Sequence, residues 1–371
     1  MKKLPLLLAL VLLAGCAGAP PGDLVPSGFA PGALMSAPGV SGATPPLDEP
    51  SDGTGEALRD PRVTLTISAV GDCTLGNSPA RDNAAGSYIH TFNRLGQDYD
   101  YFLRNVRRIF EDDDLTVANL EIPLTDATEE REAEFRFRGR PDFYKILSGS
   151  SVEAVNLANN HTMDLLQQGY DDTKANLELG GVLYVEDGKC TFYETKGFKI
   201  GLISFCYNYS QALAALRRVR GECDLVIIIM HAGTAYSYRP HSVQIANARA
   251  MIDAGADAVI GHHPHVLQGL EFYKGRYIAY SLGNFSYGGH SNPPDYDTMI
   301  LRLKFTFEDG VLLPELNDFE VVPCSVSSIT AANNYQPTPL KGAEIERFVA
   351  KFNEFSDVKI DGKISAHSYS P

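Results

Sequence analysis

Three imidazoles stand almost side by side in this chain. His262, His263 and His265 follow the apolar run at residues 257–261. An apolar run that stops at a Gly and continues into polar residues is typical of a buried strand that opens onto a site at its C-terminal edge. Imidazole is the commonest protein ligand for Zn²⁺ and similar metals. A single His is usually a satisfied core or surface residue, but three at one strand end predict a metal site.

Four other apolar runs also stop at residues that could bind a metal. The residues that follow them are Asp72, Glu121, Asn160 with His161, and His231. Each is weak evidence alone, because an Asp or Asn after a strand is most often a turn residue or a helix N-cap. The C-terminal strand edges of an α/β sheet form one crevice, so we expect these side chains to converge. Carboxylate, amide and imidazole groups together predict a site for one or two divalent metals.

The elements that must position these residues alternate between strands and helices. Strand patterns are at residues 63–70, 115–120, 154–157, 183–185, 198–205, 225–230, 258–260, 277–280, 299–307 and 311–322. Helical periodicity is at residues 101–110, 169–179 and 242–254, and Gly255 stands where a C-cap would lie. Glu308-Asp309-Gly310 predicts a hairpin between the last two strands. This order predicts an α/β fold with mixed sheets.

The N-terminus predicts export and membrane attachment. Lys2 and Lys3 precede an apolar run at residues 4–13, and Leu13-Ala14-Gly15-Cys16 resembles the bacterial lipobox, in which the Cys is lipidated. The alternative is an ordinary signal peptide that contains a Cys. Residues 17–60 are rich in Ala, Gly, Pro and Ser, and we expect a disordered tether there. The prediction is an extracytoplasmic lipoprotein, anchored at the cell surface or the periplasmic side.

The charge and the cysteines exclude some classes of site. The formal net charge is −14 and no basic cluster is present, so nucleic acid is a poor candidate partner. A polyanionic ligand would need intervening cations. The five cysteines beyond Cys16 have no Cys-x-x-Cys spacing, which argues against a four-cysteine zinc site. One or two disulfides could form, and the sequence leaves their pairing open.

Six motifs resemble, in the same order, those of the CapA family, which is linked to bacterial poly-γ-glutamate capsule synthesis. They are Gly71-Asp72, Asn119-Leu120-Glu121, residues 158–164 (ANNHTMD), His231-Ala232-Gly233, residues 261–265 (GHHPH) and residues 280–285 (YSLGNF). The family resembles a branch of the calcineurin-like metallophosphoesterases. This implies a four-layered α/β/β/α sandwich with a dimetal site at the C-terminal strand ends. We expect a signal peptide at 1–16, this domain at 61–325 and an extension at 326–371.

The resemblance also implies roles for single residues. His161 corresponds to the catalytic acid, and Asp164 lies within reach of its imidazole. His262 and Asn284 are expected to support the site, with an αL turn as the alternative role for Asn284. His263 and His265 are preferred over His262 as ligands because the superfamily signature is Gly-His-x-His. The implied ligands of one or two divalent ions (Mn, Zn, Fe or Mg) are Asp72, Glu121, Asn160, His231, His263 and His265.

Two departures from the pattern bear on activity. The superfamily often has Asp-x-His where this chain has Asp72-Cys73-Thr74, so one metal position could be weakly bound or empty. The CapA pattern His-Trp-Gly-x-Glu-Tyr is here His231-Ala232-Gly233-Thr234-Ala235-Tyr236, which lacks the Glu.

The expected function is that of a CapA-type surface lipoprotein in the synthesis, export or attachment of an anionic capsular polymer. A metal-dependent hydrolase-like site of the metallophosphoesterase type would act on that polymer or on a phosphoester. The expected partners are membrane-bound proteins of capsule polymer synthesis and export. Two alternatives stay open: an extracytoplasmic metallophosphatase or nucleotidase, and a non-catalytic polymer-binding scaffold subunit.

Overall fold

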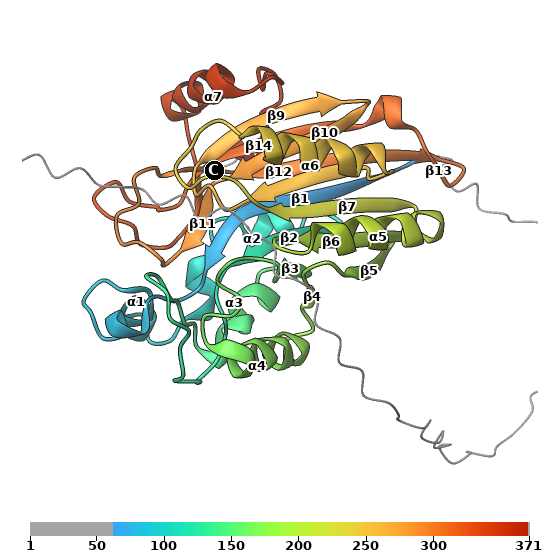
Figure 1. Cartoon of the computed structure of the whole chain (residues 1–371). Coiled ribbons are helices and arrows are strands. Elements are labelled where there is room, and N and C mark those ends of the chain that lie inside the picture. The colour runs from blue at the N-terminus through green and yellow to red at the C-terminus, as the bar shows by residue number, and fades with distance from the viewer. Residues whose placement is uncertain (1–61, 370–371) are drawn as a thin grey trace, which may run out of the picture. The chain divides into compact units, whose positions relative to one another are not determined.

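Two β-sheets form the centre of the structure, a computed structural model that describes residues 62–369 (Figure 1). The first sheet has a parallel part, β1–β2–β3–β4, extended on the other side of β1 by antiparallel strands. Its strands in spatial order are β15 (Thr338–Pro339), β14 (Asp318–Ser325), β12 (Asp297–Glu308), β1 (Arg62–Thr74), β2 (Leu115–Leu120), β3 (Ala154–Asn156) and β4 (Leu183–Val185). Two short strands also join it: β11 (Asn284–Tyr287) pairs with the end of β1, and β13 (Val311–Leu312) pairs with β12.

The second sheet has four parallel strands with an antiparallel strand at each edge. Its strands in spatial order are β5 (Cys190–Thr195), β6 (Phe198–Phe205), β7 (Leu225–His231), β8 (Ala258–His262), β10 (Arg276–Leu282) and β9 (Leu267–Tyr273).

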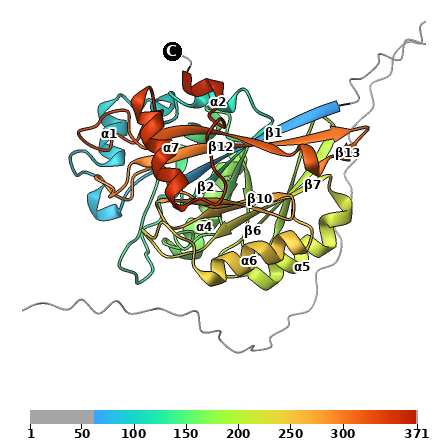
Figure 2. The same ribbon diagram turned by 90° about the horizontal axis from the view of Figure 1, so that it is seen from above.

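Helices cover the outer face of each sheet. The helices on the first sheet are α1 (Tyr88–Arg94), α2 (Arg107–Phe110), α3 (Tyr144–Ser148) and α4 (Leu166–Leu179). The second sheet is covered by α5 (Tyr209–Val219) and α6 (Ser242–Asp253), which lie side by side in Figure 2. The last helix, α7 (Ala343–Phe355), packs against β9.

Alternation along the strands explains this layering. Ile227 and Ile229 of β7 face the core between the sheets, whereas Val226 and Ile228 face the helices outside. In the first sheet, Val117 of β2 faces the inner core and Ala118 faces the opposite side. Because both faces of both sheets are buried, the fold is a four-layered α/β/β/α sandwich, and the predicted fold class is confirmed.

Local details confirm some sequence predictions and correct others. The predicted hairpin forms, and Asp309 and Gly310 take the positive φ values of its tight turn. Helix α6 ends next to Gly255, which has a φ of 108°. The helix predicted at 101–110 is wrong, because the chain forms a 3₁₀ turn at Tyr99–Phe102 and resumes as the short α2.

The strand predicted at 311–322 is also wrong in its extent. Pro314 begins a 3₁₀ turn at Pro314–Leu316, and a proline has no N–H for a sheet ladder. The pairing with β12 therefore stops at β13 and resumes at β14. The sequence patterns missed β5, β9 and α5 altogether.

The C-terminal residues pack on the same core as the rest of the fold. Ile345, Phe348 and Phe352 of α7 belong to the hydrophobic cluster between the sheets. Cys73, Cys190, Cys223 and Cys324 are free thiols. Of the helices within residues 62–369, none has the length and apolar character needed to cross a bilayer. The signal segment and Cys16, and the tether predicted at 17–60, lie outside the described residues.

Candidate metal centre

The predicted site residues come together where the C-terminal ends of strands from both sheets meet. Asp72 lies near the end of β1, Glu121 directly follows β2, and Asn160 and His161 follow β3. His231 ends β7, and residues 262–265 begin at the last position of β8. Side chains from both sheets are in contact here, since the Asn119 amide of β2 lies 3.3 Å from His231 Nδ1. The expected convergence of the five segments is therefore present in the fold.

The Asp72 carboxylate is fully buried and has polar neighbours at both oxygens. Asn119 Nδ2 donates to Asp72 Oδ1 at 2.8 Å, and the His263 backbone N–H donates to Oδ2 at 3.3 Å. His265 Nδ1 lies 3.1 Å from Oδ2, and His262 Nδ1 lies 3.2 Å from Oδ1. Asp72 thus contacts two imidazoles, one at the last residue of β8 and one in the turn that follows it. Its predicted role as a direct ligand stays a prediction.

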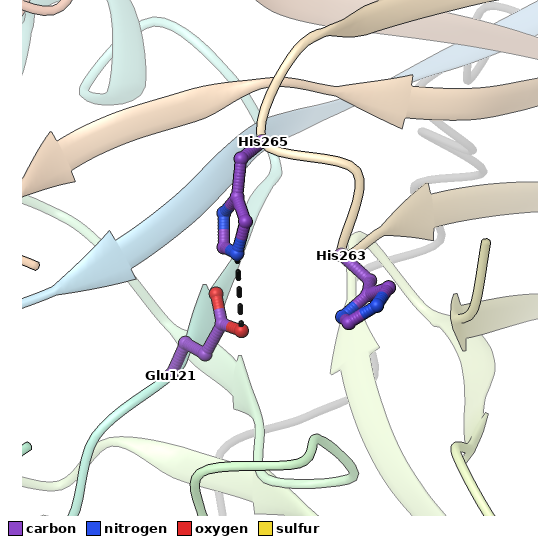
Figure 3. Close-up of side chains that lie close together, drawn as sticks. All are labelled: Glu121, His263 and His265. Carbon is purple, nitrogen blue, oxygen red and sulfur yellow. Dashed lines mark ion pairs between the residues drawn. The ribbon is translucent and has the colours of Figure 1, made fainter. Parts of the chain in front are cut away.

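Glu121, His263 and His265 form the group that is best arranged for a metal (Figure 3). One ligand atom from each of them lies within 4.8 Å of the others. Glu121 points toward His265, with Oε1 3.9 Å from Nε2, and His263 lies across from the pair. Both oxygens of the buried Glu121 carboxylate lack any hydrogen-bond partner within the described residues. Because a buried carboxylate without hydrogen bonds is costly, a bound cation suits this position.

His231 and Asn160 extend this group on one side. His231 Nε2 lies 2.6 Å from Asn160 Oδ1, 3.2 Å from His263 Nδ1 and 3.5 Å from Glu121 Oε1. His231 Nε2 can donate to Asn160 Oδ1 when no metal is bound, and the same nitrogen and oxygen atoms lie close enough together to bind one ion. Imidazole, carboxylate and amide donors fit Zn²⁺, Mn²⁺, Fe²⁺ or Mg²⁺ without distinguishing them.

The turn that carries His263 and His265 has an unusual backbone. Both residues have positive φ values, 99° and 59°. This region is uncommon for residues other than glycine, and such strain persists only where the surroundings fix it. Asn284 is one of those surroundings, because its Nδ2 donates to the His265 carbonyl at 3.2 Å and its Oδ1 lies 3.0 Å from His265 Nδ1. The left-handed residue beside it is Gly283, so the αL alternative for Asn284 is wrong.

The remaining predicted supporting residue, His262, is buried behind the turn. Neither of its ring nitrogens makes a hydrogen bond within residues 62–369, although Nδ1 is close to Asp72. Its position beside Asp72 agrees with a supporting role, and the structure assigns it no closer function.

Burial and charge set unequal pKa values on the imidazoles. Burial, and then the charge of His265, lowers the pKa of His263 to about 4. Burial and the neighbouring His263 also hold the pKa of His231 well below its ordinary value. Both imidazoles are therefore neutral at pH 7 and able to bind a metal. Asp72 differs, because His262 and His265 outweigh its burial and keep its pKa well below the usual range.

The charges around His265 and Glu121 favour a proton on this pair when no metal is bound. Burial opposes protonation of His265, but the charges of Glu121 and Asp72 raise its pKa to about 9. Burial and the Asp72 charge also raise the pKa of Glu121 well above normal. A pKa of about 9 leaves His265 protonated at pH 7 when no metal is bound. A divalent ion must displace that proton.

We therefore expect metal affinity to rise with pH. Below about pH 9 the metal-free pair holds the proton that the ion must displace, so affinity should increase about tenfold per pH unit between pH 6 and 8 and flatten above pH 9. Calorimetric titration with Mn²⁺ in buffers of different ionisation enthalpy should show about one proton released per ion at pH 7. An affinity that does not change between pH 6 and 9 would contradict this account.

His161 belongs to a separate pair next to the group. His161 Nδ1 lies 2.7 Å from Asp164 Oδ2, as expected from their spacing, and its ring packs 4.5 Å from that of Phe137. Arg131 forms an ion pair with Asp164 Oδ1 at 2.7 Å and donates to the Asn160 carbonyl at 2.7 Å. His161 and Asp164 are therefore both buried, and Phe137 and Arg131 contact them.

Sequence reasoning gave no role to Asn119 or Arg131. Asn119 could have been found, because it lies two residues before Glu121 and an extended chain places both on one face. Its side chain joins Asp72, His231 and Asn156. Arg131 comes from the loop at 121–140, which has no periodicity, so no local signal marks it.

The two departures from the family pattern have different surroundings. Thr74 stands where a His is common, and its hydroxyl is fully buried without a hydrogen-bond partner in the described part of the chain. Ala235 is exposed on the loop at residues 232–241, between β7 and α6. The imidazole of His231 is kept, and the acidic group expected after it is missing.

These observations describe a candidate divalent-metal site in an α/β/β/α fold, and a comparison with known families places the chain in one of them. Residues 66–288 match the family described as Bacterial capsule synthesis protein PGA_cap. The chain belongs to this family.

Similar proteins include the PGA biosynthesis protein CapA of Bacillus subtilis (strain 168), 29% identical over 331 residues that cover 81% of this chain and 84% of that protein. The capsule biosynthesis protein CapA of Bacillus anthracis is 29% identical over 254 residues, covering 60% and 59%. Among solved structures, a novel phosphatase of Mycoplasma pneumoniae has a TM-score of 0.40 at 14% identity, covering 70% of this chain and 93% of its own. The protein TT1561 of Thermus thermophilus has a TM-score of 0.37 at 12% identity, covering 64% and 94%.

Proposed function

We propose that this protein acts in the synthesis, export or attachment of an anionic capsular polymer through a hydrolase-like divalent-metal centre. Its family supports the role in capsule formation. The similar protein of B. subtilis is named for PGA biosynthesis, which supports a polymer of γ-linked glutamate. The observation that carries the metal centre is the buried Glu121 carboxylate, unpartnered at both oxygens beside His263 and His265.

The residues divide the chemistry between them. Glu121, Asn160, His231, His263 and His265 would hold the ion, and Asp72 fixes the imidazoles behind it. A bound divalent ion would polarise a phosphoryl or acyl oxygen and lower the pKa of a bound water. His161 would deliver a proton to the leaving group, with its ring oriented by Asp164.

Elemental analysis combined with a substrate panel tests this proposal. Purified protein should contain about one or two equivalents of a divalent metal. With Mn²⁺ added, we would assay γ-glutamyl oligomers, phosphomonoesters and phosphodiesters. Turnover that a chelator abolishes would support the hydrolase-like centre. A metal-free protein that stays inactive with every added metal would contradict it.

A second candidate function is that of an extracytoplasmic metallophosphatase or nucleotidase. The donor set favours it, because imidazole, carboxylate and amide groups around a metal also suit phosphoester cleavage. Selective turnover of phosphomonoesters, without any effect on polymer production in cells, would select this function. A third possibility, the non-catalytic scaffold, is favoured by Ala235 in place of the family Glu.

We further propose that the protein is an extracytoplasmic lipoprotein that works with membrane-bound proteins of polymer synthesis and export. Cys16 and the apolar run before it support this location. In Cys16→Ala we expect the protein to leave the membrane fraction or to remain unprocessed, since acyl chains can no longer be attached. Fractionation followed by immunoblotting measures this, with Cys206→Ala as the matched control. An unchanged membrane fraction of Cys16→Ala would rule out the anchor.

A further inference from the structure

Tyr236 lies at the boundary between the buried metal centre and solvent. Its ring centroid is 6.2 Å from that of His265, and its side chain is 48% exposed. Tyr287 packs on His265 as well, at 5.3 Å, but is only 5% exposed. Of these two tyrosines beside the centre, Tyr236 is therefore the one that an entering ligand meets.

The backbone ties Tyr236 to the turn that carries the imidazoles. The Tyr236 N–H donates to the Pro264 carbonyl at 2.7 Å, between His263 and His265. Tyr236 itself has a φ of 61°, a left-handed conformation that is a real outlier for a bulky residue. Such outliers gather at active sites and ligand clamps, where the surrounding structure holds them.

Buried polar side chains hold the residues that follow Tyr236. Gln244 Nε2 donates to Gln268 Oε1 at 2.8 Å, and Gln268 Nε2 donates to the Ser237 carbonyl at 2.7 Å. The Tyr238 hydroxyl is engaged, since it donates to Asp295 Oδ2 at 2.8 Å. The Tyr236 hydroxyl, in contrast, has no hydrogen bond within residues 62–369. The backbone at Tyr236 is held in place, and its exposed phenol hydroxyl is available to a ligand.

We propose that Tyr236 contacts the substrate, and that its hydroxyl donates a hydrogen bond to an oxyanion of the substrate, a carboxylate or a phosphoryl group. Both groups are good acceptors, and a phenol O–H is a strong donor to them. The inference rests on the proposed function, to which it adds a residue that orients the substrate. The loop around Tyr236 then acts in recognition, although Ala235 has replaced the family Glu.

The test measures binding by the full chain loaded with Mn²⁺. Isothermal titration calorimetry with an oligomer of γ-linked glutamate and with inorganic phosphate separates carboxylate from phosphoryl recognition. Tyr236→Phe should weaken the binding of at least one probe roughly tenfold, because it removes one hydrogen bond to a charged group. Its Mn²⁺ content and thermal stability should equal those of the wild type. The control is Tyr184→Phe, which removes a hydroxyl that bonds to Glu178.

In Tyr236→Phe a water molecule could replace the lost hydroxyl, so Tyr236→Ala is measured as well. It should weaken binding of the same probe at least as much. The proposal is overturned if Tyr236→Phe and Tyr236→Ala bind both probes as the wild type does, or if neither probe binds the metal-loaded wild type. Tyr236-dependent binding of the γ-linked glutamate oligomer, without turnover of that oligomer or of any phosphoester, would instead refute the hydrolase-like function and leave this inference standing.

Discussion

Replacement of His263 and His265 together by alanine is expected to remove most of the bound divalent metal. These two imidazoles and Glu121 are the group whose ligand atoms lie within 4.8 Å of one another. Imidazoles supply much of the affinity for borderline cations, so losing both should weaken binding by roughly 10²-fold or more. Metal per chain, measured by elemental analysis after dialysis, should fall to a small fraction of the wild-type value.

The matched control removes two imidazoles from elsewhere in the fold. His90 accepts a hydrogen bond from Gly86 in a surface turn, and His367 lies 3.0 Å from Asp112 Oδ2. His90→Ala with His367→Ala should keep the metal. Circular dichroism of both double variants separates metal loss from unfolding. If the folded His263/His265 variant keeps stoichiometric metal, the centre has been assigned to the wrong residues.

The buried strands of this fold could be predicted because their residues leave little choice. Residues 225–230 and 258–260 are apolar without interruption, which suits strands buried on both faces. The helix predicted at 101–110 failed for a different reason. Its apolar spacing is satisfied by two short turns, and both Leu103 and Val106, with φ values of −118°, interrupt the helix between them. Periodicity fixes which side chains are buried, and tertiary packing decides how the backbone buries them.

For the site, the sequence could predict which residues meet but not how they divide their work. Strand ends predicted Asp72, Glu121 and the imidazoles, since parallel strands bring their C-terminal ends to one edge. Loop residues and the positive φ values at His263 and His265 orient these side chains. Neither feature can be predicted from the residue types. The same limit explains Arg131, whose loop reaches Asp164 only in the folded chain.

His161 stands apart from the proposed metal ligands, although its neighbour Asn160 contacts one of them. The Asn160 amide lies 2.6 Å from His231 Nε2, whereas the His161 ring pairs with Asp164. Arg131 holds both residues, through the Asn160 carbonyl and the Asp164 carboxylate. The ring of His161 therefore has its Nδ1 engaged by Asp164, which leaves Nε2 as the atom that can reach a substrate.

His161→Ala should consequently leave metal content near the wild-type value and lower any hydrolytic rate by roughly 10²- to 10⁴-fold, the usual contribution of a general acid. Asp164→Asn should lower the rate less, because the imidazole remains but is no longer held by a carboxylate. Metal analysis and steady-state kinetics on the same preparations measure both effects. If metal and activity are lost together in His161→Ala, the residue is a ligand. If neither the rate nor polymer production in cells changes, the site does no chemistry, and the scaffold function that Ala235 suggests becomes the better account.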